Sequence, residues 1–169
     1  VVEGDRAESH RIARVLVKPL PYNLSKPVRA LYVDHERSLW VGTKGEGLLR
    51  IPNFYDRKTV DAAHVEQKTT ANSDLVDNSV YTFAASSRNL LWIGTDGDGL
   101  NYYSYADRRI HRLGVPEEMR FIHTLRDTAP DTLWVASEGC GIFRITLGGS
   151  QTHPEIRAVK RLHFNEELE

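Results

Sequence analysis

The sequence lacks cysteine pairs, an excess of charge of one sign, and long apolar runs, which are features that define several other protein classes. Its single cysteine, Cys140, cannot form an internal disulfide, so cysteine content gives no indication of the redox compartment. Lys and Arg number 22 against 23 Asp and Glu with the signs interleaved, so we expect no nucleic-acid partner. No run of eighteen apolar residues and no signal-peptide pattern occurs, so we expect no direct membrane contact by this segment.

Signatures of catalysis and metal binding are also missing. None of the seven histidines stands in a His-x-x-x-His or His-Glu-x-x-His spacing. There is no Gly-x-Ser-x-Gly, no phosphate loop, and no pair of carboxylates that stands out. The sequence therefore predicts no catalytic residue, no metal and no cofactor, although an active site assembled across repeats stays open as an alternative.

An internal repeat is centred on the three tryptophans. The ten-residue pattern Leu-Trp-Val/Ile-Gly/Ala-Thr/Ser-x-Gly-x-Gly-Leu/Ile aligns without a gap at 39–48, 91–100 and 133–142. Apolar residues also stand twelve and nine positions before each Trp. The Trp residues are 52 and 42 positions apart, so the variable length lies between the repeat cores, as expected of loops.

Each repeat is rich in β-branched and aromatic residues in short runs that Gly, Asp, Asn and Ser interrupt, which predicts strands. We expect four strands per repeat, at 28–33, 39–43, 48–51 and 62–67, at 80–85, 91–95, 100–103 and 109–113, and at 121–126, 133–137, 142–145 and 156–163. Four antiparallel strands are one blade of a propeller. The predicted fold is all-β, a partial β-propeller of about three four-stranded antiparallel blades that does not form a closed ring.

The predicted organisation is a single propeller fragment over 1–169. Residues 1–27 are expected to hold the outer strand of a preceding blade, at 11–17, and a linker. Blade one then covers 28–67, blade two 68–113, and blade three 114–169 with its outer strand. Propellers close with four to eight blades, so we expect the remaining blades of a longer chain as partners. The absence of an initiator Met before Val1 agrees with a fragment.

The repeat positions separate structural from candidate binding residues. Trp40, Trp92 and Trp134 are expected in the core, Gly42 and Gly94 where a neighbouring backbone approaches, and Gly45, Gly47, Gly97, Gly99, Gly139 and Gly141 in hairpin turns. Polar, variable positions on the same turns are the candidate ligand-binding residues: Lys44, Glu46, Asp96, Asp98 and Glu138, with Tyr105 beyond a third strand. The alternative is that they are solvated hairpin ends.

One turn has a second interpretation. Asp96-Gly97-Asp98-Gly99-x-Asn101 is similar to a calcium loop, but Leu100 stands where an oxygen ligand is required. The other repeats hold Lys44 and Glu46, or Glu138 and Cys140, at the same positions. A hairpin turn is therefore favoured over a metal site.

The segment around Asp34 followed by Leu-Trp-Val-Gly-Thr-x-Gly-x-Gly-Leu resembles the two-component regulator propeller repeat, and 75–80 resembles the lead-in of that repeat. The copies depart from it at Ser86 and Thr128, which replace Asp34, at Arg37, where Gly is usual, and at 136–137, where Ala-Ser replaces Gly-Thr.

This resemblance implies the periplasmic or other extracytoplasmic part of a membrane-bound bacterial sensor, and a segment that is not itself an enzyme. The full-length protein would carry a histidine kinase or diguanylate cyclase, and the signal would be a carbohydrate or another small molecule. The alternatives are a propeller enzyme, such as a polysaccharide lyase or hydrolase, and a protein-interaction scaffold.

Overall fold

The computed structural model describes residues 23–162 as three four-stranded antiparallel sheets. Blade one contains β1 (Val28–Val33), β2 (Leu39–Thr43), β3 (Leu48–Ile51) and β4 (Glu66–Lys68). Blade two contains β5 (Val80–Ala85), β6 (Leu90–Thr95), β7 (Leu100–Ser104) and β8 (Arg109–Leu113). Blade three contains β9 (Ile122–Ala129), β10 (Thr132–Ser137), β11 (Gly141–Gly149) and β12 (Pro154–Arg161).

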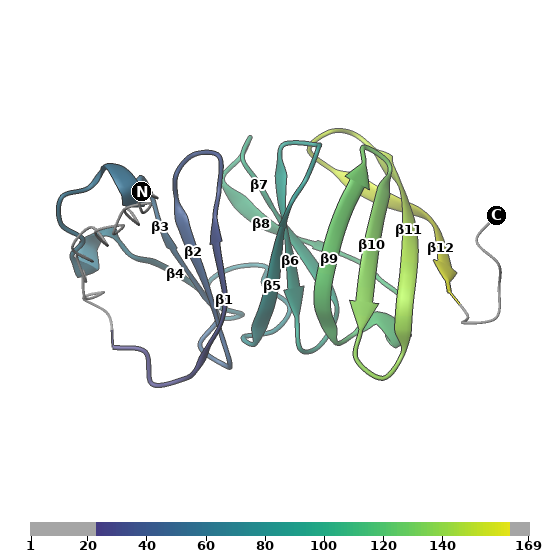
Figure 1. Ribbon diagram of the computed structural model, residues 1–169, viewed down its shortest axis with the longest axis horizontal. Helices are drawn as coiled ribbons and strands as arrows, with labels where there is room; N and C mark the ends of the chain where they lie inside the picture. Colours follow the sequence, from purple (N-terminus) through teal and green to yellow (C-terminus); the bar gives the residue numbers. More distant parts are fainter. Residues whose placement is uncertain (1–22, 163–169) are drawn as a thin grey trace, which may run out of the picture.

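The three sheets stand side by side in sequence order, with the inner strands β1, β5 and β9 next to one another (Figure 1). Strand order within each sheet follows the chain, as in a propeller blade. The fold predicted from the sequence is confirmed: the described part is an open arc of three blades. Its helices are the three-residue 3-10 turns at Phe54–Asp56, Ala62–His64 and Glu117–Met119, and none of them could cross a membrane.

The core lies between the blades. Trp40 packs edge-on against Tyr103 of blade two, with ring centroids 4.8 Å apart, and Trp40 and Trp92 are both fully buried. Trp134 is only half-buried, because no further blade among the described residues packs on blade three. At the other end of the arc, Leu31 is 67% exposed, whereas its repeat equivalent Leu125 is 3% exposed against blade two.

Glycines in the second strand allow the blades to approach. A Cβ added to Gly42 would lie 2.6 Å from the Val80 carbonyl oxygen of blade two. A Cβ on Gly94 would lie 2.7 Å from Ile122 Cγ2 of blade three. Ala136 takes this position in blade three, whose outer side is not covered by another described blade. The small residue is therefore required by the neighbouring blade.

Polar contacts also join the blades. Trp40 Nε1 donates to Asp34 Oδ2 at 2.8 Å within blade one, and the Tyr105 hydroxyl of blade two donates to the same oxygen at 3.3 Å. The Arg88 guanidinium of blade two donates to the carbonyls of Pro130, Gly148 and Ser150 in blade three. Arg88 is only 8% exposed, so these bonds form in a partly dehydrated interface.

One strand begins later than predicted. Residues 62–67 were expected as the outer strand of blade one, but Ala62–His64 is a 3-10 turn and β4 begins at Glu66. Asp61 causes the difference: its carboxylate accepts from the Ala63 amide at 3.0 Å, and His64 Nδ1 accepts from the Asp61 amide. This capping box favours a turn over extended backbone. The strand expected at 11–17 lies outside the described residues.

Candidate functional site

The same β-bulge occurs in all three inner strands, at the end where each strand begins. The pairing skips Arg29 between Val28 and Ala30, and it skips Tyr81 in β5 and His123 in β9 in the same way. These residues stand eleven positions before the three tryptophans, so they are repeat equivalents. A bulge directs its extra side chain away from the regular strand face. Arg29, Tyr81 and His123 are hereafter called the bulge row.

The turns after the second strands lie directly beside the bulge row. Lys44, Asp96 and Glu138, hereafter the turn row, stand four positions after each tryptophan. Their amides donate to the carbonyls of Pro27, Ser79 and Phe121 at 2.9, 2.9 and 3.0 Å. Each carbonyl lies two residues before a bulge residue. The backbone therefore holds the two rows at one end of the molecule, which we call the turn face.

Side chains of the bulge row contact one another across the blades. The Tyr81 and His123 rings are stacked, with centroids 4.7 Å apart and an interplanar angle of 12°. Arg29 Cζ lies 5.5 Å from the centre of the Tyr81 ring, which is a cation–π distance. One residue from each blade thus contributes to a continuous Arg–Tyr–His row.

Two carboxylates of the turn row converge on His123. Its Nε2 lies 3.2 Å from Glu138 Oε2 and 3.6 Å from Asp96 Oδ1. The Tyr81 phenol also contacts Asp96; burial raises the pKa of this phenol, and the hydrogen bond to Asp96 raises it further. A ligand on this surface would meet a neutral phenol, an imidazole, two carboxylates and the Arg29 guanidinium within a short distance.

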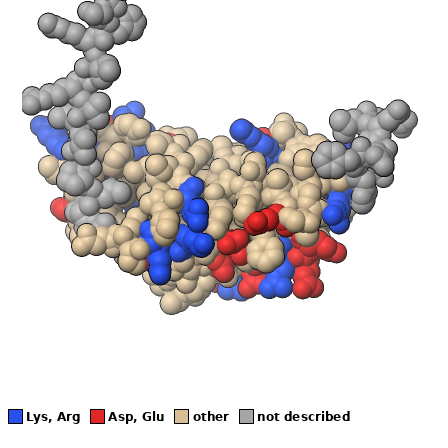
Figure 2. Space-filling view, turned by 60° about the horizontal axis from the view of Figure 1, so that its bottom comes forward, with Lys and Arg blue, Asp and Glu red and all other residues tan. Residues whose placement is uncertain are grey.

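The charges on this surface are divided by sign. Figure 2 turns the lower end of Figure 1 forward and shows basic side chains gathered beside acidic ones. Lys44 and Arg29 of blade one are exposed, and Asp98 and Glu138 of blades two and three are exposed as well. A ligand that spans the three blades would therefore experience both signs of charge.

The remaining candidate ligand residues have individual positions. Glu46 lies on the turn face and accepts from the Ser25 hydroxyl, while Asp98 forms an ion pair with Arg120 at 2.9 Å. Tyr105, expected to be accessible beyond the third strand, is instead 8% exposed. It packs on Tyr103 and donates to Asp34, so its position is that of a core residue between blades one and two.

The residues of the calcium-like segment point in different directions. Asp96 faces His123, Asp98 pairs with Arg120, and Asn101 is fully buried. The Asn101 amide donates to the carbonyls of Asp74 and His111 and accepts from the Val76 amide. The three side chains therefore form no common ligand set.

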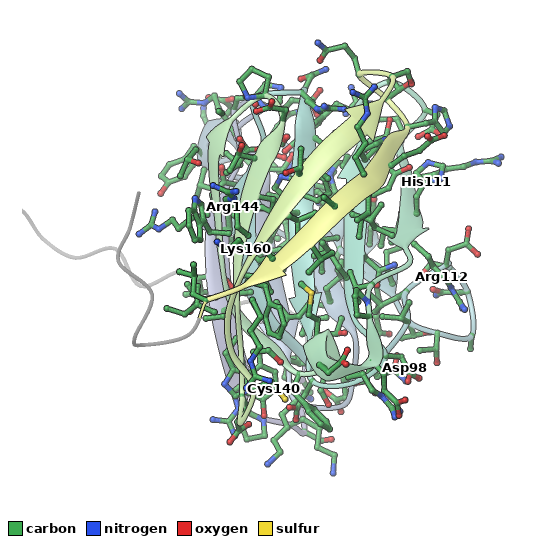
Figure 3. The ribbon with its side chains drawn as sticks, turned by 90° about the vertical axis from the view of Figure 1, so that its right-hand side faces the viewer. Asp98, His111, Arg112, Cys140, Arg144 and Lys160 are labelled. Atoms are coloured by element: carbon green, nitrogen blue, oxygen red, sulfur yellow. The ribbon has the colours of Figure 1, made fainter. Side chains whose placement is uncertain are left out.

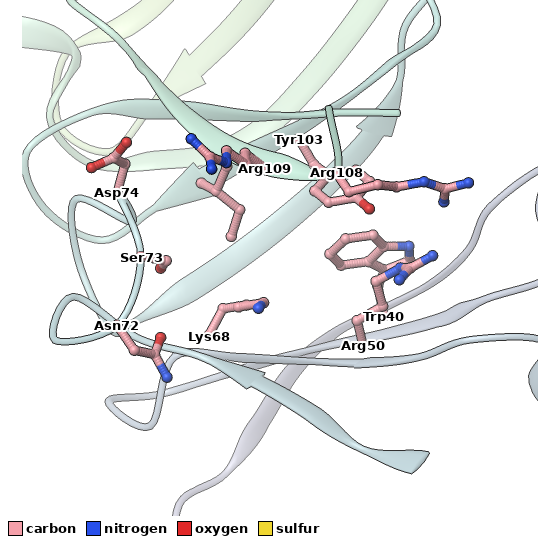
Figure 4. A pocket seen from close by; sticks show the side chains of 10 residues that line it. Trp40, Arg50, Lys68, Asn72, Ser73, Asp74, Tyr103, Arg108 and Arg109 are labelled. Carbon is pink, nitrogen blue, oxygen red and sulfur yellow. The ribbon is translucent and has the colours of Figure 1, made fainter. Parts of the chain in front are cut away.

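A separate cleft of about 550 Å³ lies between blades one and two (Figure 4). Its lining includes Trp40, Tyr103 and the basic side chains Arg50, Lys68, Arg108 and Arg109. The two aromatic residues are 0% and 3% exposed, so they offer no ring face to a ligand. Arg50 pairs with Glu36 and Glu66, and Arg108 pairs with Glu36, so half of these cations are already neutralised.

Reasoning from the sequence identified the turn row but missed the bulge row. The apolar columns twelve and nine residues before each Trp were used to define the inner strand. These two apolar columns are three residues apart, which breaks the two-residue alternation of a regular strand, and the column that holds Arg, Tyr and His lies between them. That break is the signal of a bulge and could have indicated these residues.

Residues 74–97 match the family model of the two component regulator propeller. This stretch includes the second half of the loop before β5 and all of β5 and β6, and therefore Tyr81, Trp92 and Asp96. No curated protein sequence matches the chain at a significant level.

Solved structures share the fold at low identity. One is the extracellular domain of a protein described as hybrid two component system BT3049 from B. thetaiotaomicron, with a TM-score of 0.64, 15% identity, and coverage of 89% of this chain and 20% of that one. The corresponding domain of BT4673 from the same organism has a TM-score of 0.58, 20% identity, and coverage of 72% and 16%.

A third similar structure is PorZ, described as a surface component of the type-IX secretion system of Porphyromonas gingivalis, with a TM-score of 0.52, 18% identity, and coverage of 73% and 18%. The chain spans a fifth or less of the length of each of these proteins. At these identities the likeness concerns the fold. The family match and the three Trp-centred sheets together identify the chain as a propeller segment that carries a two component regulator propeller repeat.

Proposed function

We propose that this chain is part of the extracytoplasmic sensor region of a bacterial two-component system and that its turn face binds a carbohydrate signal. The observation that carries the proposal is the bulge repeated in three blades, which sets Arg29, Tyr81 and His123 beside Lys44, Asp96 and Glu138. Bulges are common where a side chain is directed into a binding site. The family match of blade two supports the signalling context.

The chemistry of the turn face suits a sugar. Hydroxyl groups need both donors and acceptors, which Arg29, Tyr81, Asp96 and Glu138 supply together. The Tyr81 and His123 rings cover each other, so the pair offers ring edges and an outer ring face to the apolar face of a pyranose ring. The half-buried ring of Tyr81 is held by its neighbours, so little conformational entropy is lost on binding.

Signalling would follow from coupling between blades. The row takes one residue from each blade, and a ligand that contacts all three favours one arrangement of the blades over others. A ligand shifts a sensor only by its different affinity for two arrangements. In this proposal the segment has no catalytic step of its own, the rest of the propeller supplies further blades, and the output domain lies elsewhere in the protein.

A glycan array with the purified chain tests this proposal. We expect binding to at least one glycan class, weakened about tenfold or more in Tyr81→Ala and Asp96→Asn, since each loses roughly 1.4 kcal/mol or more of contact energy. Asp131→Ala, in the β9–β10 turn at the other end of blade three, is the control and should bind as the unchanged chain does. Silence across all glycans, or equal binding by all variants, would reject the proposed site.

The same side chains favour a second candidate, a polysaccharide lyase or hydrolase. A phenol, an imidazole and two carboxylates in mutual contact can act as acid and base on a sugar. This candidate predicts new reducing ends when the chain is incubated with the glycan that it binds. If the chain binds the glycan but produces no new reducing ends, the enzyme candidate is rejected and the binding function is retained.

A further inference from the structure

A second group of metal-ligating side chains lies away from the turn face. Asp107 and His111 belong to the β7–β8 hairpin of blade two, and His153 precedes β12 of blade three. One ligand atom from each of the three lies within 4.8 Å of the others. Figure 3 shows His111 far from Asp98 and Cys140, which mark the turn face.

Contacts with neighbouring side chains hold the two histidines in place. His111 Nε2 lies 2.8 Å from Asp107 Oδ2, and the His111 ring is stacked on Tyr102 with centroids 5.1 Å apart and an angle of 19°. His153 Nδ1 lies 3.0 Å from the Thr152 hydroxyl, and one ring nitrogen of His153 lies within 4.8 Å of the ligand atoms of Asp107 and His111. The two imidazole rings are 5.6 Å apart at 67°.

The Asp107 carboxylate is held in its charged form. Burial raises its pKa, but the hydrogen bonds from His111 and from the Arg109 amide lower it by more, so the pKa lies below its ordinary value. The ionised carboxylate and neutral imidazoles are the forms that bind metals.

We propose that Asp107, His111 and His153 form a zinc site that joins blade two to blade three at the outer edge of the propeller. Two imidazoles and one carboxylate are a zinc ligand set, with water or a further group completing the tetrahedron. Tetrahedral ligands at 2.0–2.1 Å lie about 3.4 Å apart, so the side chains need move only slightly.

The position gives the ion a structural consequence. β8 and β12 are the outermost strands of their sheets, whereas the shared core of blades two and three is built around Trp92 and Leu125. A zinc ion would cross-link the outer strand of one blade to the β11–β12 connection of the next, and so restrict their relative motion.

Among residues 23–162, one other group could hold a metal: Asp96, His123 and Glu138 on the turn face. It has one imidazole against two for the proposed site. Zinc favours nitrogen ligands, so we expect it at the group with two imidazoles. Zinc at that group would be lost on changing His111 or His153, whereas zinc on the turn face would be lost on changing His123.

Isothermal titration of the purified chain with zinc chloride tests the proposal. We expect one zinc ion per chain. Removing a residue that only hydrogen-bonds to a metal ligand typically lowers metal affinity about 10–100-fold. Removing a ligand itself, as in His153→Ala or His111→Phe, should therefore lower zinc affinity at least tenfold. His111→Phe keeps a ring stacked on Tyr102, and His153 is exposed, so both variants should fold, which circular dichroism checks.

His123→Ala and His64→Ala are the matched controls and should keep full affinity, since His64 pairs with one carboxylate of the described segment, that of Asp61. The absence of zinc binding, binding that survives in the His111 and His153 variants, or binding lost in His123→Ala would each overturn the proposed site. Glycan binding is measured separately, without zinc and with the unchanged chain, so failure of the zinc site leaves the test of the proposed function intact.

Discussion

The indole Nε1 of Trp92 donates a 2.9 Å hydrogen bond to Oδ2 of Asp127, a residue of the neighbouring blade. In blade one the equivalent Trp40 finds its acceptor, Asp34, in its own blade. Blade two has Ser86 at the position of Asp34, and the Ser86 hydroxyl donates to the same Asp127 oxygen at 2.8 Å. The carboxylate missing from blade two is therefore supplied by blade three.

Asp127→Ala should lower the free energy of unfolding by about 2 kcal/mol, because it leaves the buried Trp92 indole and the Ser86 hydroxyl without their charged acceptor. Chemical denaturation measures this. Asp131→Ala is the control. The Asp131 carboxylate is exposed and, within residues 23–162, accepts a hydrogen bond from the adjacent Thr132, so its loss should change stability by no more than about 0.5 kcal/mol. If both changes had the same effect on stability, Asp127 would not be the acceptor that stabilises the contact between blades two and three.

Arg88→Lys should destabilise the chain by about 1–3 kcal/mol, because a single ammonium cannot bond the three carbonyls of blade three that the planar guanidinium reaches. Arg144→Lys, at an exposed position on β11, is the matched control, with no expected change (Figure 3). Denaturation midpoints compare the two. An unaltered midpoint for Arg88→Lys would mean that the carbonyls are satisfied in another way.

Gly42→Ala should cost about 1–3 kcal/mol, since the new methyl group would lie 2.6 Å from the Val80 carbonyl oxygen and the blades would have to separate. Gly114→Ala is expected to be neutral or to stabilise by about 0.5 kcal/mol, because nothing lies within 4 Å of its added Cβ. Thermal unfolding of both variants decides the point. A Gly42→Ala chain as stable as its parent would contradict the close approach.

The unfolding free energy should fall above about pH 10. Burial, and then the charge of Asp34 and the hydrogen bond to it, raise the pKa of Tyr105 well above its ordinary value. Unfolded tyrosine titrates near pH 10, so above that pH the unfolded chain loses a proton that the folded chain keeps. The stabilisation is complete below about pH 10 and decreases as pH rises.

Tyr105→Phe removes this contribution. Above pH 10 the unfolding free energy of the variant should therefore decline less steeply than that of the unchanged chain, and the two slopes should differ by about 1.4 kcal/mol per pH unit. Denaturation at a series of pH values measures both slopes. Tyr55→Phe, at a position that is 59% exposed, should reproduce the slope of the unchanged chain. Parallel slopes for all three chains would show that Tyr105 is not buried beside Asp34.

The sequence predicted most of the fold because the strands repeat at fixed distances from each Trp. Eleven of the twelve strands lie within a few residues of their expected positions. The outer strand of blade one, expected near 62–67, begins only at Glu66, because the local capping by Asp61 outweighs strand preference in an exposed segment. The role of Asp127 was not predicted because it accepts a hydrogen bond from the tryptophan of another repeat. An alignment of repeats compares equivalent positions and does not indicate contacts between different repeats.

The candidate site was predicted in part. The turn row follows from the hairpin geometry that glycines such as Gly45, with φ of 103°, impose. The bulge row depends on how two strands pair, and Tyr105 is buried by a contact with Asp34 from a segment 71 residues away. Such pairings depend on the packing of whole blades, so single positions did not indicate them.

The indole N–H signals of the three tryptophans test the blade arrangement most directly. In a proton–nitrogen correlation spectrum of the labelled chain we expect slow hydrogen exchange for Trp40 and Trp92, and fast exchange for the half-buried Trp134. Asp127→Ala should shift the Trp92 signal and speed its exchange, while the Trp40 signal stays unchanged. A Trp92 signal that does not respond to Asp127→Ala would contradict the packing of blade three against blade two.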